Sequence, residues 1–246
     1  MNPSPIASRL GFVAVALSTP LVLLALVIVP YLSSSWVAFE QDRTGAATLT
    51  GFAPDDLRTV TSAILNDLVS GTGEFDVQLD GAPVLTAAER SHMRDVRGVF
   101  ASLYAAAAVA LAILGVAFWL GARRGGSSWS LRDAWRGARF GAIGLASGTV
   151  LAGVVALVAF DAAFEVFHRL FFAQGTYLFD PATSRLVQLF PDAFWSETAI
   201  AVGIMILIVA GGAAWLAGRR LRAYPASAVA DAAAGERRAA AHGTAR

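Results

Sequence analysis

The chain has 246 residues, 56% of them apolar, and a mean hydropathy of +0.59. This composition excludes an ordinary soluble domain or a disordered chain and places the protein in the membrane class. The formal net charge of +1 comes with no nucleic-acid-binding signature, and the absence of cysteine excludes disulfides and a thiol nucleophile.

Four apolar runs are long enough to cross the ~30 Å hydrocarbon core of a bilayer, which takes about 20 helical residues. They lie at about 10–33, 98–120, 139–160 and 197–217. The first run is too long for a signal peptide and lacks a small-residue cleavage site, so we expect a retained helix. The predicted fold class is an all-α integral membrane protein with four transmembrane helices.

The placement of arginine predicts the orientation of these helices. The loop at 121–139 holds five arginines against one acid, and the last span is followed by GRRLR at 218–222. In contrast, segment 34–97 has five arginines against ten acids, and segment 161–197 has two against five. Because positive loops stay on the cytoplasmic side, we expect both termini to be cytoplasmic and both acidic segments to be extracytoplasmic.

Between the first two spans, residues 34–97 are expected to form a small extracytoplasmic cap. Apolar residues at helical spacing predict an amphipathic helix at about 54–69. Apolar alternation over 75–79, followed by Asp80-Gly81, predicts a short β-hairpin. A fragment this small is marginal alone, so we expect it to pack on the ends of the membrane helices.

A capping box, Thr86-x-x-Glu89, predicts that the next helix begins well before its apolar run. No proline interrupts the sequence from there to Leu120, so one long helix is expected to carry His92 on a stalk continuous with the second span. A second box of the S-x-x-D type, at 130–133, opens the helix of the third span.

The predicted domain organisation is one membrane domain and a tail. Residues 1–222 form the four-helix membrane domain, which includes the cap and an outer loop at 161–196. Residues 223–246 are Ala-rich and sparsely apolar, which predicts a disordered cytoplasmic tail, and we expect no role for His242 within it.

The other two histidines, His92 and His168, are the most informative residues in the chain. Each lies at the outer end of a predicted span, and these two spans are consecutive and antiparallel. From Leu120 out to His92 is 28 residues, and from Phe140 out to His168 is also 28. At ~1.5 Å per residue, the two imidazoles are expected to meet at one height, near the lipid headgroups.

Acidic residues accompany both histidines at helical spacing. Asp95 follows His92 by three residues and can orient its ring, while Asp161, Glu165 and His168 form one polar stripe. Either histidine alone is more often a structural residue, but the pair at one membrane face favours chemistry. The many surrounding aromatic residues are typical of an interfacial belt, or alternatively of a groove for acyl chains. No second copy of Glu165-x-x-His168 exists for a di-metal site, and we predict neither metal nor cofactor.

Two blocks of the sequence resemble the lipoprotein intramolecular transacylase (Lit) family of bacterial four-span membrane proteins. The first, at 89–97, is similar to an H-M-x-D-V core that begins at His92. The second, at 167–195, is similar to the pattern F-H-x-x-x-F…W-x-F-D-P…P-x-x-F-F. This sequence departs from the family at Tyr177, where Trp is usual, and at Ser184, where Asp is frequent.

The resemblance implies a transferase that acts on diacylated lipoproteins in the bacterial cytoplasmic membrane, with its site on the extracytoplasmic face. It would move the sn-2 acyl chain of an S-diacylglyceryl cysteine onto the α-amine of that cysteine, which gives a lyso-form lipoprotein. The substrate supplies both nucleophile and ester, so the enzyme needs no serine or cysteine nucleophile.

On this hypothesis one imidazole accepts the proton of the amine, and the other polarises the ester or protonates the departing alkoxide. Two carboxylates are candidates for orienting the rings, and two further side chains for stabilising the oxyanion. The site residues are thus His92 and His168 with Asp95, Glu165, Tyr177 and Arg169. Two alternatives remain: another interfacial lipid acyltransferase or hydrolase, with or without a metal, and a non-enzymatic membrane scaffold whose cap binds a partner protein.

Overall fold

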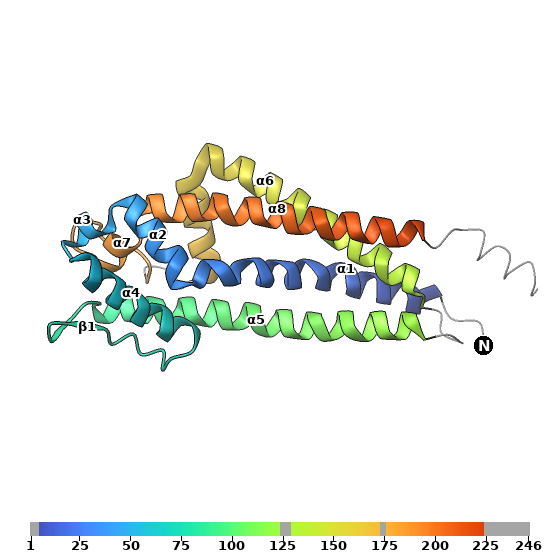
Figure 1. Cartoon of the computed structure of the whole chain (residues 1–246), viewed down its shortest axis with the longest axis horizontal. Helices are drawn as coiled ribbons and strands as arrows, with labels where there is room; N and C mark the ends of the chain where they lie inside the picture. The colour runs from blue at the N-terminus through green and yellow to red at the C-terminus, as the bar shows by residue number, and fades with distance from the viewer. Residues whose placement is uncertain (1–4, 124–128, 173–175, 224–246) are drawn as a thin grey trace, which may run out of the picture.

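The computed structural model describes residues 5–123, 129–172 and 176–223. Figure 1 shows a bundle of long helices with a cluster of short elements at one end, opposite the first described residues and the end of α8. Four helices are long and apolar enough to cross a membrane: α1 (Pro5–Ile28), α5 (Ala87–Ala122), α6 (Leu131–Phe171) and α8 (Asp192–Arg222). The predicted all-α, four-span membrane fold is confirmed. The tail predicted at 223–246 lies outside the described residues, apart from Ala223.

Helix α6 packs closely on α1 through two glycines. A Cβ atom on Gly137 would lie 3.0 Å from the Val15 side chain, and one on Gly141 would collide with the carbonyl oxygen of Ala16. Lipid tails are as apolar as the helices, so association inside a bilayer depends on close van der Waals packing. The Gly-x-x-x-Gly spacing supplies that packing and anchors the inner half of α6.

The outer part of α6 departs from a straight helix. Ala159 has φ −149° and ψ 58°, which breaks the helix at that residue. In Figure 1, α6 runs away from the other helices and then turns sharply back across the bundle. The expectation that His92 and His168 reach one height on two straight helices therefore does not hold for α6. The returning segment, 160–171, carries His168 instead.

The cap confirms the predicted helix and hairpin and adds two helices that were not predicted. Its elements are α2 (Ser34–Thr44), α3 (Ala46–Thr50), α4 (Pro54–Val69), β1 (Gln78–Leu79) and β2 (Ala82–Pro83). Asp80 and Gly81, with φ of 51° and 76°, form the turn between the two antiparallel strands. A short 3₁₀ turn, η1 (Val29–Leu32), connects α1 to the cap.

The cap does not form its core alone. Its buried apolar residues pack against α7 (Arg185–Leu189) and the first turn of α8. The largest fully buried apolar side chains in this core are Phe75, Ile64 and Leu189. Cap and outer loop are therefore packed together, which fixes the segment before α7 relative to the start of α5.

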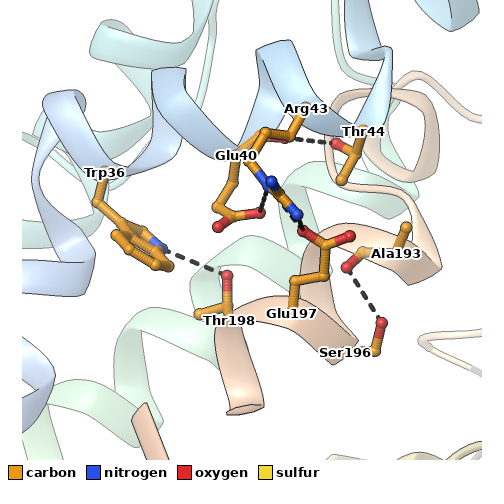
Figure 2. A network of polar contacts seen from close by, with 8 residues as sticks. All are labelled: Trp36, Glu40, Arg43, Thr44, Ala193, Ser196, Glu197 and Thr198. Atoms are coloured by element: carbon orange, nitrogen blue, oxygen red, sulfur yellow. Dashed lines mark hydrogen bonds and ion pairs between the residues drawn. The ribbon is translucent and has the colours of Figure 1, made fainter. Parts of the chain in front are cut away.

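Polar contacts between α2 and α8 also dock the cap on the bundle (Figure 2). The indole N–H of Trp36 donates to Thr198 Oγ1 at 3.3 Å, and Arg43 Nη2 donates to Glu197 Oε2 at 2.6 Å. The Glu40 carboxylate lies 3.8 Å from Arg43 Nε and is only 3% exposed. Burial, followed by the neighbouring Glu197 carboxylate, raises the pKa of Glu40 above its usual value.

Candidate active site

His92 lies in the second turn of α5, and a capping box fixes the start of that helix. The Thr86 N–H donates to Glu89 Oε2 at 2.7 Å, and the Glu89 N–H donates to Thr86 Oγ1 at 3.3 Å. The predicted box is thus confirmed. The box sets where α5 begins, and His92 lies in the next turn, where its side chain is 7% exposed.

His168 lies in the last turn of α6 and is oriented by its own helix. Its Nδ1 is 2.8 Å from the carbonyl oxygen of Phe164, four residues earlier. A carbonyl oxygen only accepts, so Nδ1 must carry the hydrogen of this bond, and Nε2 holds the lone pair of the neutral ring. The ring, which is 9% exposed, therefore presents Nε2 as a proton acceptor.

The two imidazoles meet, as the sequence predicted. Their ring centroids are 6.0 Å apart and their planes are inclined by only 20°. His92 Nδ1 is buried and has no hydrogen-bond partner among the residues that the structure describes. A buried polar atom without a partner is costly, and such atoms are characteristic of places where a ligand or substrate completes the bonding.

Three aromatic side chains that follow α6, Phe172, Tyr177 and Phe179, cover the imidazoles and are referred to here as the aromatic wall. Phe172 contacts both rings, at centroid distances of 4.8 Å to His92 and 5.3 Å to His168. Phe179 lies 5.7 Å from His92, and Tyr177 lies 5.0 Å from His168. The imidazoles are thereby buried among aromatic rings, and this buried apolar setting is called the recess here.

The remaining predicted site residues lie at the edge of this recess. Glu165 and Arg169 form an exposed ion pair one turn apart on α6. Asp95 is exposed on α5, and no hydrogen bond links its carboxylate to either imidazole. The orientation of His168 that was expected from a carboxylate comes instead from a backbone carbonyl. Within the described ranges, no three His, Asp or Glu side chains gather in a group that could hold a metal ion.

Sequence reasoning missed a second function of Glu89 beside the site. This carboxylate is 1% exposed, and in addition to capping α5 it accepts hydrogen bonds from Ser184 and Leu186, far away in sequence. The capping-box pattern accounts for only one of its oxygens. Because no local pattern links residues about 95 positions apart, the sequence carried no signal for the second interaction.

Comparison with known proteins supports the family suggested by the sequence. The family model "Lipoprotein intramolecular transacylase Lit" matches residues 13–195, which is well over half of the chain. This chain belongs to the lipoprotein intramolecular transacylase (Lit) family. It is therefore a membrane-integral enzyme of the transacylase class, and the family name denotes a lipoprotein substrate. No curated protein matches by sequence.

Solved structures of the membrane-integral Lit from Bacillus cereus share the fold of this Lit family member. One is 17% identical with a TM-score of 0.71, and the match covers 90% of this chain and 98% of that one. A variant of it with a histidine replaced by arginine is 18% identical with a TM-score of 0.66, covering 89% and 93%. A variant with a histidine replaced by alanine is 18% identical with a TM-score of 0.64, covering 88% and 92%.

Proposed function

We propose that this Lit family member moves the sn-2 acyl chain of an S-diacylglyceryl cysteine onto the α-amine of the same cysteine, and that His92 and His168 transfer the protons. The observation that carries the proposal is the pair of imidazoles 6.0 Å apart, with His92 Nδ1 unpartnered in the described residues and His168 Nε2 presented as an acceptor. Two such nitrogens in one recess suit a reaction that takes a proton from one atom and returns it to another.

The reaction balances without any outside reactant. The amine nitrogen attacks the ester carbonyl carbon, an N–C bond forms, and the bond from that carbon to the glycerol oxygen breaks. One imidazole accepts the proton that the amine loses, and the departing alkoxide receives a proton from the other. The products are an amide and a free glycerol hydroxyl, so the lipopeptide is isomerised and its mass does not change.

Side chains around the imidazoles support two further roles, stabilisation of the oxyanion and attraction of the substrate amine. The Tyr177 ring packs on His168 at 5.0 Å, and Arg169 follows His168 in the chain, so both remain candidates for donating to the oxyanion. The carboxylates of Asp95 and Glu165 are exposed, so they would attract the ammonium form of the substrate.

The distribution of charge supports an extracytoplasmic location for the site. The end of the bundle that holds the histidines also carries the acid-rich cap and α7, whereas the arginine-bearing start of α6 and end of α8 lie at the opposite end. We therefore place the site on the extracytoplasmic face of the cytoplasmic membrane. Exposed apolar side chains beside it, Phe167, Leu170 and Leu178, would face lipid and guide acyl chains into the recess.

The test is tandem mass spectrometry of a lipoprotein N-terminal peptide from a host that lacks the activity, with and without this chain. Transacylation predicts an unchanged peptide mass, an acyl group located on the α-amine by fragmentation, and loss of reactivity toward amine reagents. A hydrolase acting at the same site would instead lower the mass by one acyl chain and leave the amine free. An unchanged N-terminus in cells that contain the inserted protein would refute the proposal.

A further inference from the structure

Glu89 uses its two carboxylate oxygens for two separate tasks. Oε2 accepts from the Thr86 N–H at 2.7 Å and from Thr86 Oγ1 at 2.8 Å, which completes the cap of α5. Oε1 accepts from Ser184 Oγ at 2.5 Å and from the Leu186 N–H at 2.9 Å, and neither contact contributes to capping α5. A carboxylate buried to 99% with two donors on each oxygen is fully satisfied, and it ties α5 to the segment before α7.

This segment directly follows Phe179, a residue of the aromatic wall, in the sequence. The Ser184 N–H donates to the carbonyl oxygen of Asp180 at 2.8 Å, which closes a turn immediately after Phe179. Ser184 Oγ also accepts from the Val187 N–H at 3.3 Å, so the same side chain begins α7. Hydrogen bonds therefore connect Glu89 to Ser184, and Ser184 to Asp180, the residue that follows Phe179.

Helix α5 connects the same carboxylate to His92. Glu89 and His92 are three residues apart on α5 and hence on one face of the helix. Phe179 packs on the His92 ring at 5.7 Å. One carboxylate thus fixes both the helix that presents His92 and the turn that covers it.

We propose that Glu89 is a positioning residue of the Lit site, whose Oε1 fastens the 179–186 segment over the imidazoles and keeps the recess closed to water. This inference rests on the proposed function for the reaction that the recess serves. It assigns Ser184 as the partner of Glu89 and predicts that the hydroxyl at position 184, rather than the cap of α5, is what the site needs.

Glu89→Gln tests whether the carboxylate holds the 179–186 segment, because glutamine has the same shape as glutamate. An amide has one acceptor oxygen, so its NH₂ group must face one of the two pairs of donors, and the buried bonds to one side are lost. Ser184→Ala removes only the distal hydroxyl. Thr86→Ala is the matched control, since it weakens the cap and leaves both bonds of Oε1 in place. Ser184→Thr keeps the hydroxyl and is the conservative rescue.

The first readout is the rate at which diethyl pyrocarbonate modifies His92 in the purified full chain, followed by mass spectrometry of the peptide that contains it. The second is kcat and KM on a diacylated lipopeptide. We expect Glu89→Gln and Ser184→Ala each to speed modification of His92 and to lower kcat by about tenfold. The double variant should be no worse than the more affected single variant. Thr86→Ala and Ser184→Thr should match the wild type.

Unchanged modification of His92 in Ser184→Ala would overturn the proposal, as would an equal increase in Thr86→Ala. If Glu89→Gln fails to accumulate in the membrane, Ser184→Ala decides by the same two readouts. A wild-type protein without transacylase activity would refute the proposed function, yet the modification rates would still decide the role of Glu89.

Discussion

The helix that carries His92 is continuous over 36 residues, whereas the helix that carries His168 is broken at Ala159. On α5, the buried carboxylate of Glu89, one turn before His92, ties the helix to the segment before α7. On α6, the histidine reaches the site only because the outer segment turns back across the bundle (Figure 1).

The two histidines are therefore held in one site by different interactions. The position of His92 depends on a rigid stalk and on hydrogen bonds that water cannot easily replace. The position of His168 depends on a backbone conformation at Ala159, on the carbonyl of Phe164 and on aromatic contacts. Substitutions on the two helices should therefore impair the site in different ways.

The largest effect is expected from removing either imidazole. Since general acid–base catalysis contributes about 10²–10⁴-fold, His92→Ala and His168→Ala should each lose nearly all N-acyl lyso-lipoprotein. His242→Ala is the control, because it removes the third histidine of the chain. Tandem mass spectrometry of a lipoprotein peptide, with immunoblotting for membrane insertion, measures the outcome. Full product from an inserted His92→Ala or His168→Ala protein would exclude the shared site.

The break in α6 provides the next largest effect. Proline requires φ near −65°, so Ala159→Pro is incompatible with the observed φ of −149° and should displace His168. A misplacement of about 1 Å can cost about 10²-fold in rate. Ala87→Pro is the matched control on the other helix, because proline is tolerated at the first helical position of α5. Equal lipopeptide turnover by both variants would show that the break in α6 is irrelevant.

A smaller effect is expected at Tyr177, whose ring packs on His168 but not on His92. Tyr177→Phe keeps the ring and removes the hydroxyl, so kcat should fall by about tenfold while KM changes little. Tyr104→Phe makes the same change in the middle of α5 and should leave kcat unaltered. An unchanged kcat in Tyr177→Phe would remove the hydroxyl from the proposed oxyanion donors.

The smallest effect lies away from both histidine helices, at Glu40. Its raised pKa means that the folded protein binds this proton more tightly than the unfolded chain does. The stabilisation by the protonated form is therefore present below the ordinary pKa of 4.5 and is lost as the pH rises through the raised value. Glu40→Gln mimics the protonated form and should raise Tm at pH 8 by about 2–4 °C, with no gain at pH 4.

Thermal unfolding in detergent at the two pH values measures this effect. Glu197→Gln is the control, because it weakens the ion pair with Arg43 and should lower Tm at pH 8. A lower Tm for Glu40→Gln at pH 8 would mean that the charged carboxylate stabilises the docking of α2 on α8.

Local sequence signals predicted α5 and the short cap elements well. The Thr86–Glu89 box, the absence of proline up to Leu120 and the Asp80-Gly81 turn each depend on neighbouring residues. The break at Ala159 had no such signal, because neither glycine nor proline stands there and the run that leads to it, 150–160, is apolar. Helices α3 and α7 have five residues each, too few to show a helical period, and the buried face of α2 includes the polar Glu40 and Gln41.

The site was predicted where chemistry depends on scarce residue types and missed where it depends on tertiary contacts. His92 and His168 were identified because the chain has only three histidines and two of them flank membrane spans. The carbonyl of Phe164 orients His168, and Glu89 meets Ser184 across 95 residues. Neither contact leaves a pattern in the sequence, because a backbone carbonyl has no residue identity and long-range pairs have no fixed spacing.

The most direct test of the shared site is a double-mutant cycle on purified protein in lipid nanodiscs with a synthetic diacylated lipopeptide. Initial rates of N-acylation would be measured for the wild type, His92→Ala, His168→Ala and the double variant. If both imidazoles act on one reaction, each single variant should lose about as much rate as the double variant. A wild-type rate in either single variant, or losses that multiply in the double variant, would contradict a single site built from both helices.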